Sequence, residues 1–415
     1  MSEPHPHIPG LRFLHAPGPT HLPDAVLAAM ARQPMDLADP RVAATLAACE
    51  AGVRRLAGTA VAQPIFFIAN GHGAWEAVVQ NLLAPDAQAL VPGTGHFSES
   101  WARQTEALGR GVVRTPWVEG QPMDVDAVEA ALRADLGGGH SRIAAVFMVH
   151  TDTASGTTHS IDAVRAAMDA AGHPALLVVD AVASLGAAPL AMDAQRIDVL
   201  VGASQKGLML PPGVGFTLVN PAAMAVAAAN PTPRFYWDWV LRVGEMPYQK
   251  FCGTPPLTLM AGMEAGLGLL FAEGLPAVFA RHRRLAGAVH AAVAAWSSGG
   301  ALDFFCQAPA ARSVSVTAIA TAPGVDADAI RRTAREAFDV SIAGGLGPLA
   351  GRVFRIGHLG DLSGPMVLGA LGGVQAALNH LRMPIGSDGV AAAVDYLARE
   401  AASARAASDT SGEPR

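Results

Sequence analysis

Between about residues 60 and 220, short apolar runs alternate with longer amphipathic segments, and this alternation limits the possible folds most strongly. The runs that we expect to be strands are Pro64–Ala69, Ala87–Val91, Ile143–Val149, Ala175–Val179, Val199–Gly202 and Gly215–Val219. The segments that we expect to be helices are Ala74–Leu83, Ser98–Leu108, Val125–Ala134 and Ile161–Ala171. Strands that are apolar along their whole length are typical of a mostly parallel sheet with helices on both faces. The pattern therefore predicts an α/β fold, in which ligands bind at the carboxyl ends of the strands.

The order of the predicted elements changes after about residue 260. Here we expect helices and strands at Leu257–Glu273, Leu275–Trp296, Ser313–Ala320, Asp326–Phe338, Val353–Ile356 and Pro365–Leu381. This order favours a smaller α+β domain. We therefore expect four parts: an N-terminal segment (1–25) that packs with the small domain, a large α/β domain (26–260), the small domain (261–400) and a disordered tail (401–415).

Composition and charge exclude several classes of protein. The net charge is −6 and the sequence has no dense basic block, which argues against nucleic acid as a main partner. No apolar stretch reaches the ~18–20 residues that a membrane-spanning helix needs. The three cysteines are too few and too widely spaced for a disulfide framework or a zinc site. Because the first residues lack the basic and apolar regions of a secretory signal, we expect a cytoplasmic protein.

Lysine is almost absent from the chain, and this singles out one residue. Of the 29 basic residues, only Lys206 and Lys250 are lysines. Lys206 follows an apolar strand and precedes a Pro-Pro-Gly turn, whereas Lys250 lies in a polar segment that suits an ordinary surface charge. A desolvated lysine has a lowered pKa and can form a Schiff base, which the permanently charged arginine cannot do. The sequence therefore predicts that Lys206 is a catalytic amine.

Polar residues also follow several predicted strands. Asp180 could protonate the nitrogen of a pyridine cofactor, or it could simply cap the next turn. The turn from Asn70 to Gly73 opens a helix and could hold an anion through its N–H groups, although two glycines also suit a tight turn. Phe97 could stack on the flat ring of a cofactor, or it could pack at the edge of the hydrophobic core. The hydroxyls of residues 151–156 could bond a ring oxygen.

Arg355 lies inside an apolar strand near the C-terminal end of the chain. A guanidinium there could clamp a substrate carboxylate through two parallel hydrogen bonds, and an ordinary salt bridge is the alternative. His72 and Glu76 stand four residues apart, but no further metal-binding pattern accompanies them. We therefore predict no metal site.

Several motifs together resemble a known family. They are Pro17–Thr20, Gly73–Ala77, Gly95–Phe97, Ser204–Gly213, Tyr236–Trp239 and Phe354–Asp361. With these motifs the chain resembles the class V aminotransferases of pyridoxal phosphate (PLP) fold type I, and in particular the serine–glyoxylate and alanine–glyoxylate aminotransferases. The resemblance extends from Pro17 to Leu381. It implies a large domain with a mostly parallel seven-stranded sheet, a smaller C-terminal α+β domain, and PLP as cofactor.

The resemblance also implies roles for single residues. Lys206 would hold PLP and move a proton between the substrate Cα and the cofactor, and Asp180 would pair with the pyridine nitrogen. The implied cofactor-binding residues, besides these two, are Gly71, His72, Gly73, Phe97, Thr153, Val182, Gln205 and Thr254. Among them, Phe97 and Val182 would sandwich the ring, and Thr254 would come from the partner subunit of a homodimer. Arg355 would bind the α-carboxylate of the substrate.

Four segments depart from the family pattern. Met35–Asp39 lacks a His-Arg pair, Asn70–Gly73 replaces Ser-Gly-Thr-Gly, Asp152 replaces a glutamate near the substrate, and Phe251–Pro255 lacks the tyrosine that often precedes Thr254. The lysine, the aspartate and the arginine are intact. We therefore expect transfer of an amino group from serine or alanine to glyoxylate or another small 2-oxo acid. The alternatives are an aspartate or pyridoxamine donor, a PLP-dependent lyase, the less favoured cysteine desulfurase, or a non-catalytic binding protein.

Overall fold

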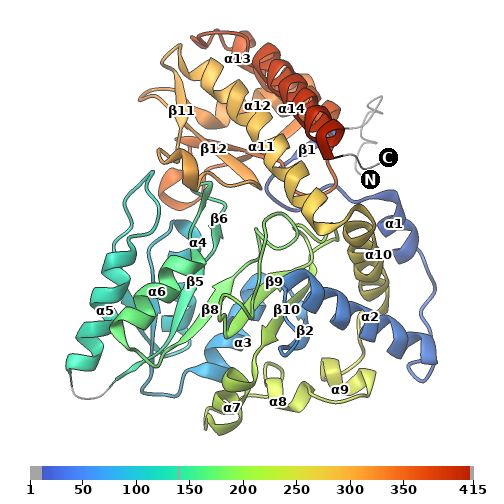
Figure 1. The fold of residues 1–415 in the computed structure, drawn as a ribbon, viewed down its shortest axis with the longest axis vertical. Coiled ribbons are helices and arrows are strands. Elements are labelled where there is room, and N and C mark those ends of the chain that lie inside the picture. Colours follow the sequence, from blue (N-terminus) through green and yellow to red (C-terminus); the bar gives the residue numbers. More distant parts are fainter. Residues whose placement is uncertain (1–11, 139–140, 412–415) are drawn as a thin grey trace, which may run out of the picture.

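The computed structural model describes residues 12–138 and 141–411 (Figure 1). Their larger sheet has seven strands in the order β2, β10, β9, β8, β5, β3, β4. These strands are β2 (Gln63–Ala69), β3 (Gln88–Val91), β4 (Gly111–Arg114), β5 (Ile143–Val149), β8 (Leu176–Asp180), β9 (Val199–Ala203) and β10 (Gly213–Val219). From β9 to β4 all neighbours are parallel, and only β10 is antiparallel to its neighbours β2 and β9. The expected mostly parallel seven-stranded sheet is confirmed.

Both faces of this sheet are buried, which explains why its strands are apolar without interruption. In β5, Val146 and Met148 pack into one hydrophobic cluster, while Phe147 and Val149 pack into another. The second cluster includes Trp75 and Trp101, which come from helices α3 (Gly71–Leu82) and α4 (His96–Ala107). Because successive side chains of a strand point to opposite faces, each strand contributes to both clusters.

The remaining helices of this part of the chain are α1 (Asp24–Met30), α2 (Pro40–Ala57), α5 (Val125–Gly137), α6 (Ile161–Ala171), α7 (Pro221–Ala229), α8 (Trp239–Arg242) and α9 (Pro247–Phe251). The sequence analysis missed α2, although its boundary signals are clear. Asp39 caps its N-terminus, Pro40 is its first residue, and Gly58 ends it in the left-handed conformation. These are the residues preferred at helix ends. The analysis also missed β4, a short and only half-buried strand at the sheet edge.

The second sheet lies above the first in Figure 1 and has five strands in the order β1, β13, β14, β12, β11. They are β1 (Phe13–His15), β11 (Leu302–Phe304), β12 (Val316–Thr321), β13 (Val340–Gly344) and β14 (Val353–Gly357). The accompanying helices are α10 (Leu257–Glu273), α11 (Leu275–Ser297), α12 (Ala327–Phe338), α13 (Gly364–His380) and α14 (Gly389–Ser411). β1 pairs with β13 in parallel, so the N-terminal segment is an edge strand of this C-terminal sheet.

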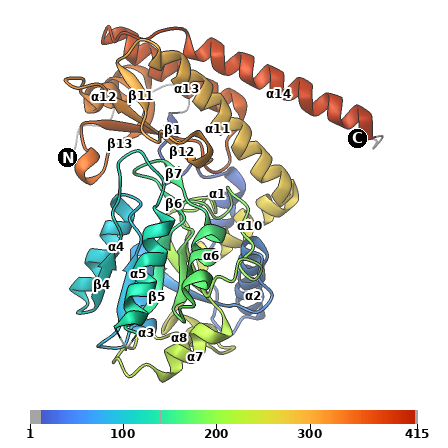
Figure 2. The same ribbon diagram turned by 60° about the vertical axis from the view of Figure 1, so that its left-hand side comes forward.

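The expected disordered tail from residue 401 differs from the structure. Helix α14 continues through Ser411, while residues 412–415 lie outside the described part of the chain. Figure 2 shows α14 extending beyond the body of the molecule. The sequence Ala398–Ser411 is rich in alanine and contains neither proline nor glycine, and alanine favours helix more than any other residue. The small polar residues at the end of the chain concealed this propensity.

In the described residues, no single helix is long and apolar enough to cross a membrane. Helices α10 and α11 reach the required length and composition only as a pair, and they bend by 86° at Gly274. Met260, Met263 and Leu267 of α10 and Val289 and Trp296 of α11 are buried in the hydrophobic clusters of this structure.

Candidate active site

One edge of the seven-stranded sheet gathers the polar residues that follow its strands. Strand β8 ends at Asp180, which pairs in register with Val149 at the end of β5 and with Val201 near the end of β9. Ala69, the last residue of β2, pairs with Gly213 at the start of β10. The loops that carry Lys206, Asp180, Asp152, Phe97 and the Asn70–Gly73 turn therefore leave the sheet at the same edge.

Lys206 lies in the short loop between β9 and β10. The hydroxyl of Ser204 fixes this loop, because it donates to the carbonyl of Pro211 at 2.7 Å and accepts the N–H of Val214 at 3.2 Å. Burial lowers the pKa of the Lys206 amine from 10.5 to about 8. This value also includes a smaller lowering by the positive charge of Arg355 and an opposing rise from the negative charge of Asp180. A substantial fraction of the amine is therefore neutral near pH 8, as a nucleophile requires.

The N-terminal segment passes directly over this lysine. The Lys206 amine donates to the carbonyl of Pro17, and the hydroxyl of Thr20 donates to the carbonyl of Lys206 at 3.1 Å. Gly18 has a φ of +120°, and a Cβ atom there would lie 2.6 Å from Lys206 Nζ. The sequence analysis quoted Pro17–Thr20 as a motif but did not predict this contact, since no local pattern relates residues 186 positions apart.

Asp180 is buried beside Lys206, and its carboxylate accepts the N–H of Val182 at 2.7 Å. The pKa of Asp180 is raised to about 7, mainly by burial and also by the nearby Asp152, while the hydrogen bond from Val182 and the charge of Lys206 oppose this rise. The Val182 bond is the turn cap that the sequence analysis considered as an alternative. The Val182 N–H bonds only one oxygen of the Asp180 carboxylate, so the other oxygen can accept a hydrogen bond from a second partner.

The turn at the start of α3 is organised by Asn70. Its side-chain oxygen accepts the N–H groups of His72 at 3.1 Å and Gly73 at 3.3 Å. Two of the N–H groups expected to hold an anion are thus already bonded. A Cβ at Gly73 would lie 2.6 Å from Ala69 Cβ, which gives this glycine a packing reason of its own. His72 bonds Ser100 Oγ at 3.3 Å, and burial lowers its pKa.

The aromatic residues of the site lie at the rim of one hydrophobic cluster. Phe97 and Val182 are both partly buried against it. The ring of Trp75 lies 4.5 Å from His72 and 6.4 Å from Phe97, measured between centroids. Phe97 therefore belongs to the edge of the core and also to the edge of the site, so that both roles considered for it are compatible.

Arg355 projects from β14 of the C-terminal sheet and is buried. Its guanidinium donates to the carbonyl of Gly344 at 2.8 Å and to the carbonyl of Thr153 at 2.9 Å. Within the described residues both hydrogen bonds of this guanidinium go to carbonyls and none to a carboxylate. Burial lowers the pKa of Arg355 to about 10, which the charge of Asp152 partly opposes. The ordinary salt bridge considered for Arg355 is thus absent from the described part of the chain.

Two further candidates differ in their surroundings. Gln205 precedes the lysine, and its Oε1 is buried without a hydrogen-bond partner among residues 12–138 and 141–411. Thr254 lies in the loop between α9 and α10 and is exposed. The structure therefore brings all the candidates of this chain to one sheet edge except Thr254, for which no contact to the others is found in the described chain.

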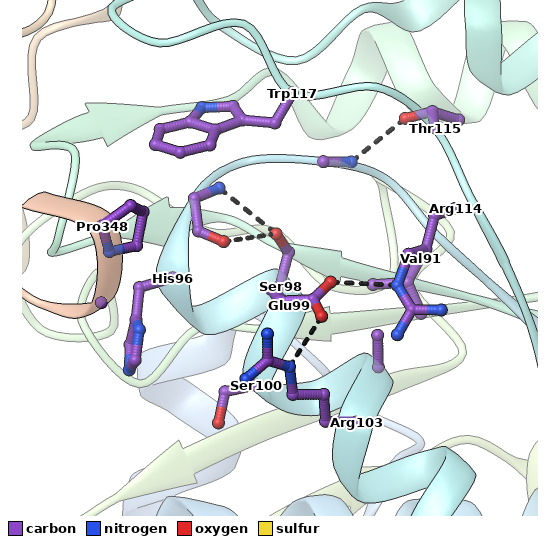
Figure 3. Close-up of a pocket in the computed structure, with 14 residues that line it drawn as sticks. Val91, His96, Ser98, Glu99, Ser100, Arg103, Arg114, Thr115, Trp117 and Pro348 are labelled. Atoms are coloured by element: carbon purple, nitrogen blue, oxygen red, sulfur yellow. Dashed lines mark hydrogen bonds and ion pairs between the residues drawn. The ribbon is translucent and has the colours of Figure 1, made fainter.

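A cavity of about 590 Å³ lies beside this constellation (Figure 3). His96, Trp117 and Pro348 line it, and Figure 3 shows Glu99 between Arg103 and Arg114. Lys206, Asp180 and Arg355 are not among its lining residues. As for metals, the described residues contain no group of three or more His, Cys, Asp or Glu side chains that could hold an ion.

The arrangement fits PLP on two observations. The buried Gln205 Oε1 has no hydrogen-bond partner in the described residues, so this amide can turn and donate from its NH₂ group to a bound phosphate. A Cβ at Gly71 would lie 3.2 Å from Val182 Cγ2, so that glycine keeps space between the α3 turn and the second residue after Asp180.

Comparison with known proteins agrees with this geometry. The family described as aminotransferase class-V matches residues 12–347. The chain is 39% identical to the serine–glyoxylate aminotransferase of Methylorubrum extorquens (94% of this chain, 96% of the relative). It is 38% identical to the L-aspartate–glyoxylate aminotransferase of Paracoccus denitrificans (94% and 97%). The crystal structure of pyridoxamine–pyruvate aminotransferase from Mesorhizobium loti superposes with a TM-score of 0.83 at 26% identity (94% and 97%). The chain therefore belongs to the class-V aminotransferases, which are PLP-dependent transaminases.

Proposed function

We propose that this transaminase moves the amino group of a small amino acid, serine or alanine, to glyoxylate or another small 2-oxo acid. The observation that carries the proposal is the grouping of three side chains: the Lys206 amine with its pKa near 8, the buried Asp180, and the buried Arg355 without a carboxylate partner. Bound PLP supplies an electron sink for the bond that breaks at the substrate Cα.

In this proposal Lys206 binds the cofactor and moves the substrate proton. The neutral amine at Nζ would hold the cofactor through its aldehyde carbon and would act as the base for the α-proton of the amino acid. Its low pKa serves both roles, because an amine with an ordinary pKa is almost fully protonated at pH 7. The carbonyl of Pro17 orients the amine by accepting its hydrogen bond.

Asp180 and the α3 turn hold the cofactor in this scheme. Asp180 offers one carboxylate oxygen to the pyridine nitrogen, while Val182 keeps the other. Because Asn70 occupies the N–H groups of His72 and Gly73, we assign the phosphate to Gly71 and to the side chains of His72 and Gln205. Gly73 contributes to the α3 turn by packing closely against Ala69, where a Cβ atom would not fit. Phe97 and Val182 cover the two faces of the ring, and Thr153 bonds its 3-oxygen.

Arg355 is the carboxylate clamp of the proposed reaction. A buried guanidinium whose bonds all go to neutral carbonyls keeps its full positive charge. A carboxylate beside it forms charge-assisted hydrogen bonds, roughly twice as strong as neutral ones. The α-carboxylate is common to the amino acid and the 2-oxo acid, so that one clamp serves both halves of the reaction.

We further propose a cytoplasmic homodimer with shared active sites. Large apolar side chains are exposed along one segment that precedes Thr254: Phe235, Val240, Leu241, Val243, Met246 and Tyr248. A contiguous exposed apolar segment favours a protein interface. We assign a second copy of this chain as the partner that covers the exposed apolar segment. Thr254 lies exposed at the end of this segment. It would reach the phosphate in the neighbouring subunit only if the segment lies at the dimer interface.

The near absence of lysine allows a sharp test of the cofactor site. The purified protein is incubated with PLP and reduced with borohydride, and the pyridoxyl-labelled peptide is identified by mass spectrometry. We expect the label on Lys206, loss of the visible absorption band in Lys206→Arg, and an unchanged band in the matched variant Lys250→Arg. Lys250 is suited as a control because it pairs with Glu50, an ion pair that arginine preserves. A label on Lys250, or no absorption band, would contradict the proposal.

The donor is tested by half-reactions. The PLP form is mixed with serine, alanine, aspartate or pyridoxamine, and conversion to the amine form is followed by absorbance. We expect serine and alanine to react fastest. Faster conversion by aspartate or pyridoxamine would favour the second candidate, which the activities named for the Paracoccus and Mesorhizobium relatives support. Decomposition of the donor without conversion to the amine form would indicate a lyase.

A further inference from the structure

Asp152 is a fully buried carboxylate that the proposed reaction does not yet use. It lies on the two-residue strand β6 (Thr151–Asp152), which forms a hairpin with β7 (Thr157–Thr158) after the end of β5. Its oxygens accept the N–H groups of Phe97 and Ala154, both at 2.9 Å, and the hydroxyl of Thr94 at 3.2 Å. One side chain thus ties the loop after β3 to the loop after β5.

The loop after β3 is shaped to receive this carboxylate. Gly95 has a φ of +146°, a conformation that glycine adopts at little cost. A Cβ atom at this position would lie 2.9 Å from Asp152 Oδ2. The sequence analysis placed Asp152 near the substrate as a shortened acid. The structure instead encloses it in backbone, where its length suits the distance to the Phe97 N–H.

Asp152 also connects to the carboxylate clamp. The carbonyl of the next residue, Thr153, accepts the hydrogen bond from Arg355 at 2.9 Å. Burial raises the pKa of Asp152, while the hydrogen bonds from Ala154, Phe97 and Thr94 lower it. In its ionised form Asp152 raises the pKa of Arg355 against the effect of burial. The Ala154 N–H donates to the Asp152 carboxylate, which fixes the backbone conformation from Asp152 to Ala154. The direction of the Thr153 carbonyl, which lies between them, therefore depends on the Asp152 side chain.

We propose that Asp152 is a positioning residue that holds the Phe97 ring and the Arg355 guanidinium in fixed places in the proposed site. The inference deepens the proposed function and rests on it, because Phe97 and Arg355 matter only if PLP and a carboxylate substrate bind there. A positioning role of Asp152 can be distinguished by experiment from a role in stabilising the fold alone. Removing one of the two acceptor oxygens of Asp152 should loosen the ring face and the clamp together, even where the fold persists.

The test uses Asp152→Asn in the full-length enzyme loaded with PLP. The amide has nearly the same shape, but it has only one acceptor oxygen. The N–H groups of Phe97 and Ala154 bond different oxygens of the carboxylate, so the amide cannot accept both. We expect a loss of at least half of the circular dichroism of the bound cofactor, which reports a rigidly held ring, at equal PLP occupancy. We also expect KM for the amino acid and the 2-oxo acid to rise about tenfold, the size of one lost charged hydrogen bond, with a smaller change in kcat.

Asp135→Asn is the matched control. Asp135 also accepts backbone N–H groups and a hydroxyl, from Arg142, Ile143 and Ser141, but it does so at the opposite end of β5. We expect it to lower the melting temperature without changing the dichroism or KM. If Asp152→Asn behaves like Asp135→Asn, Asp152 is only structural and the inference is overturned.

A second variant protects the test against misfolding. Thr94→Val removes one hydrogen-bond donor and leaves the carboxylate charged. In Thr94→Val we expect a smaller loss of cofactor dichroism and a smaller rise of KM than in Asp152→Asn. If Asp152→Asn does not fold, unchanged dichroism and KM in Thr94→Val would contradict the inference. Failure of the wild-type protein to bind PLP at Lys206 would instead contradict the proposed function, so that the two failures are distinguishable.

Discussion

The guanidinium of Arg355 donates to the carbonyl oxygen of Thr153 at 2.9 Å, across 202 residues of sequence. This bond joins β14 of the five-stranded sheet to the loop that follows β5 of the seven-stranded sheet. The proposed substrate clamp is therefore anchored to both sheets. Its orientation depends on how the two sheets meet as well as on its own strand.

Arg355→Ala should weaken the binding of carboxylate substrates far more than it weakens PLP binding. Loss of one partner of a buried charge pair costs about 2–5 kcal/mol, so we expect KM for both substrates to rise by about 100-fold or more. Arg355→Lys, which keeps the charge without the planar fork, should lie in between. Steady-state kinetics and PLP titration measure both effects.

Arg352→Ala is the control for this prediction. Arg352 lies three residues away and forms an exposed ion pair with Glu119 at 2.8 Å. Exposed pairs contribute little, so KM should not change. Equal effects of the two substitutions would show that the carboxylate binds elsewhere.

The capture of PLP should depend on pH through Lys206. Only the neutral amine attacks, and burial lowers its pKa to about 8, so the rate should rise with pH with a midpoint near 8 and not near 10.5. Asp180 favours the charged amine, and Asp180→Asn should therefore move the midpoint below 8. Stopped-flow absorbance at a series of pH values measures the rate. A midpoint near 10.5 in the wild-type protein would contradict the desolvated lysine.

Gly18→Ala should impair the cofactor site through a direct clash. The added Cβ would lie 2.6 Å from Lys206 Nζ, and overpacking of this kind costs about 1–3 kcal/mol. We expect PLP binding to weaken at least tenfold, as measured by titration. Gly324→Ala is the matched control, because Gly324 also has a positive φ, of +86°, but no atom within 4 Å of the added Cβ. It should cost stability and leave PLP binding unchanged, whereas equal losses of PLP binding would argue that backbone strain alone is responsible.

The proposed dimer should depend on the exposed apolar segment before Thr254. We expect the double substitution Phe235→Asp and Met246→Asp to shift the molar mass from twice to once the chain mass of 42.5 kDa, because burying two carboxylates in an interface is costly. Light scattering after size exclusion measures the mass. Leu136→Asp, a substitution at another exposed apolar residue on α5, should leave the dimer intact. A wild-type monomer would contradict the shared active site.

The sequence was sufficient to predict the elements whose signals are local. Ile143–Val149 and Ile161–Ala171 match the structure to the residue, since apolar runs and helical periodicity are properties of neighbouring residues. Lys206 emerged from the same sequence because lysine is otherwise so scarce. Helix α2 was not predicted, although Asp39, Pro40 and Gly58 mark its ends, because it precedes the region in which strands and helices alternate.

The contacts around the site were beyond sequence reasoning. No pattern in Pro17 or Gly18 indicates that their backbone crosses Lys206, because this proximity results from β1 pairing with β13 in the distant sheet. Nor does the Asn70–Gly73 turn reveal that Asn70 occupies two of its own N–H groups. Such relations depend on side-chain geometry and on tertiary packing, which residue types alone do not specify.

The antiparallel direction of β10 has a consequence for how the substrate specificity of this enzyme could evolve. Lys206 sits on a nine-residue connection between β9 and β10, which are antiparallel neighbours in the same sheet. The loop of the reactive amine is therefore held at both ends by paired strands of one sheet. Substitutions in the other loops can alter which amine donor fits while the nucleophile stays in place, so one unchanging reaction centre can accommodate new substrates.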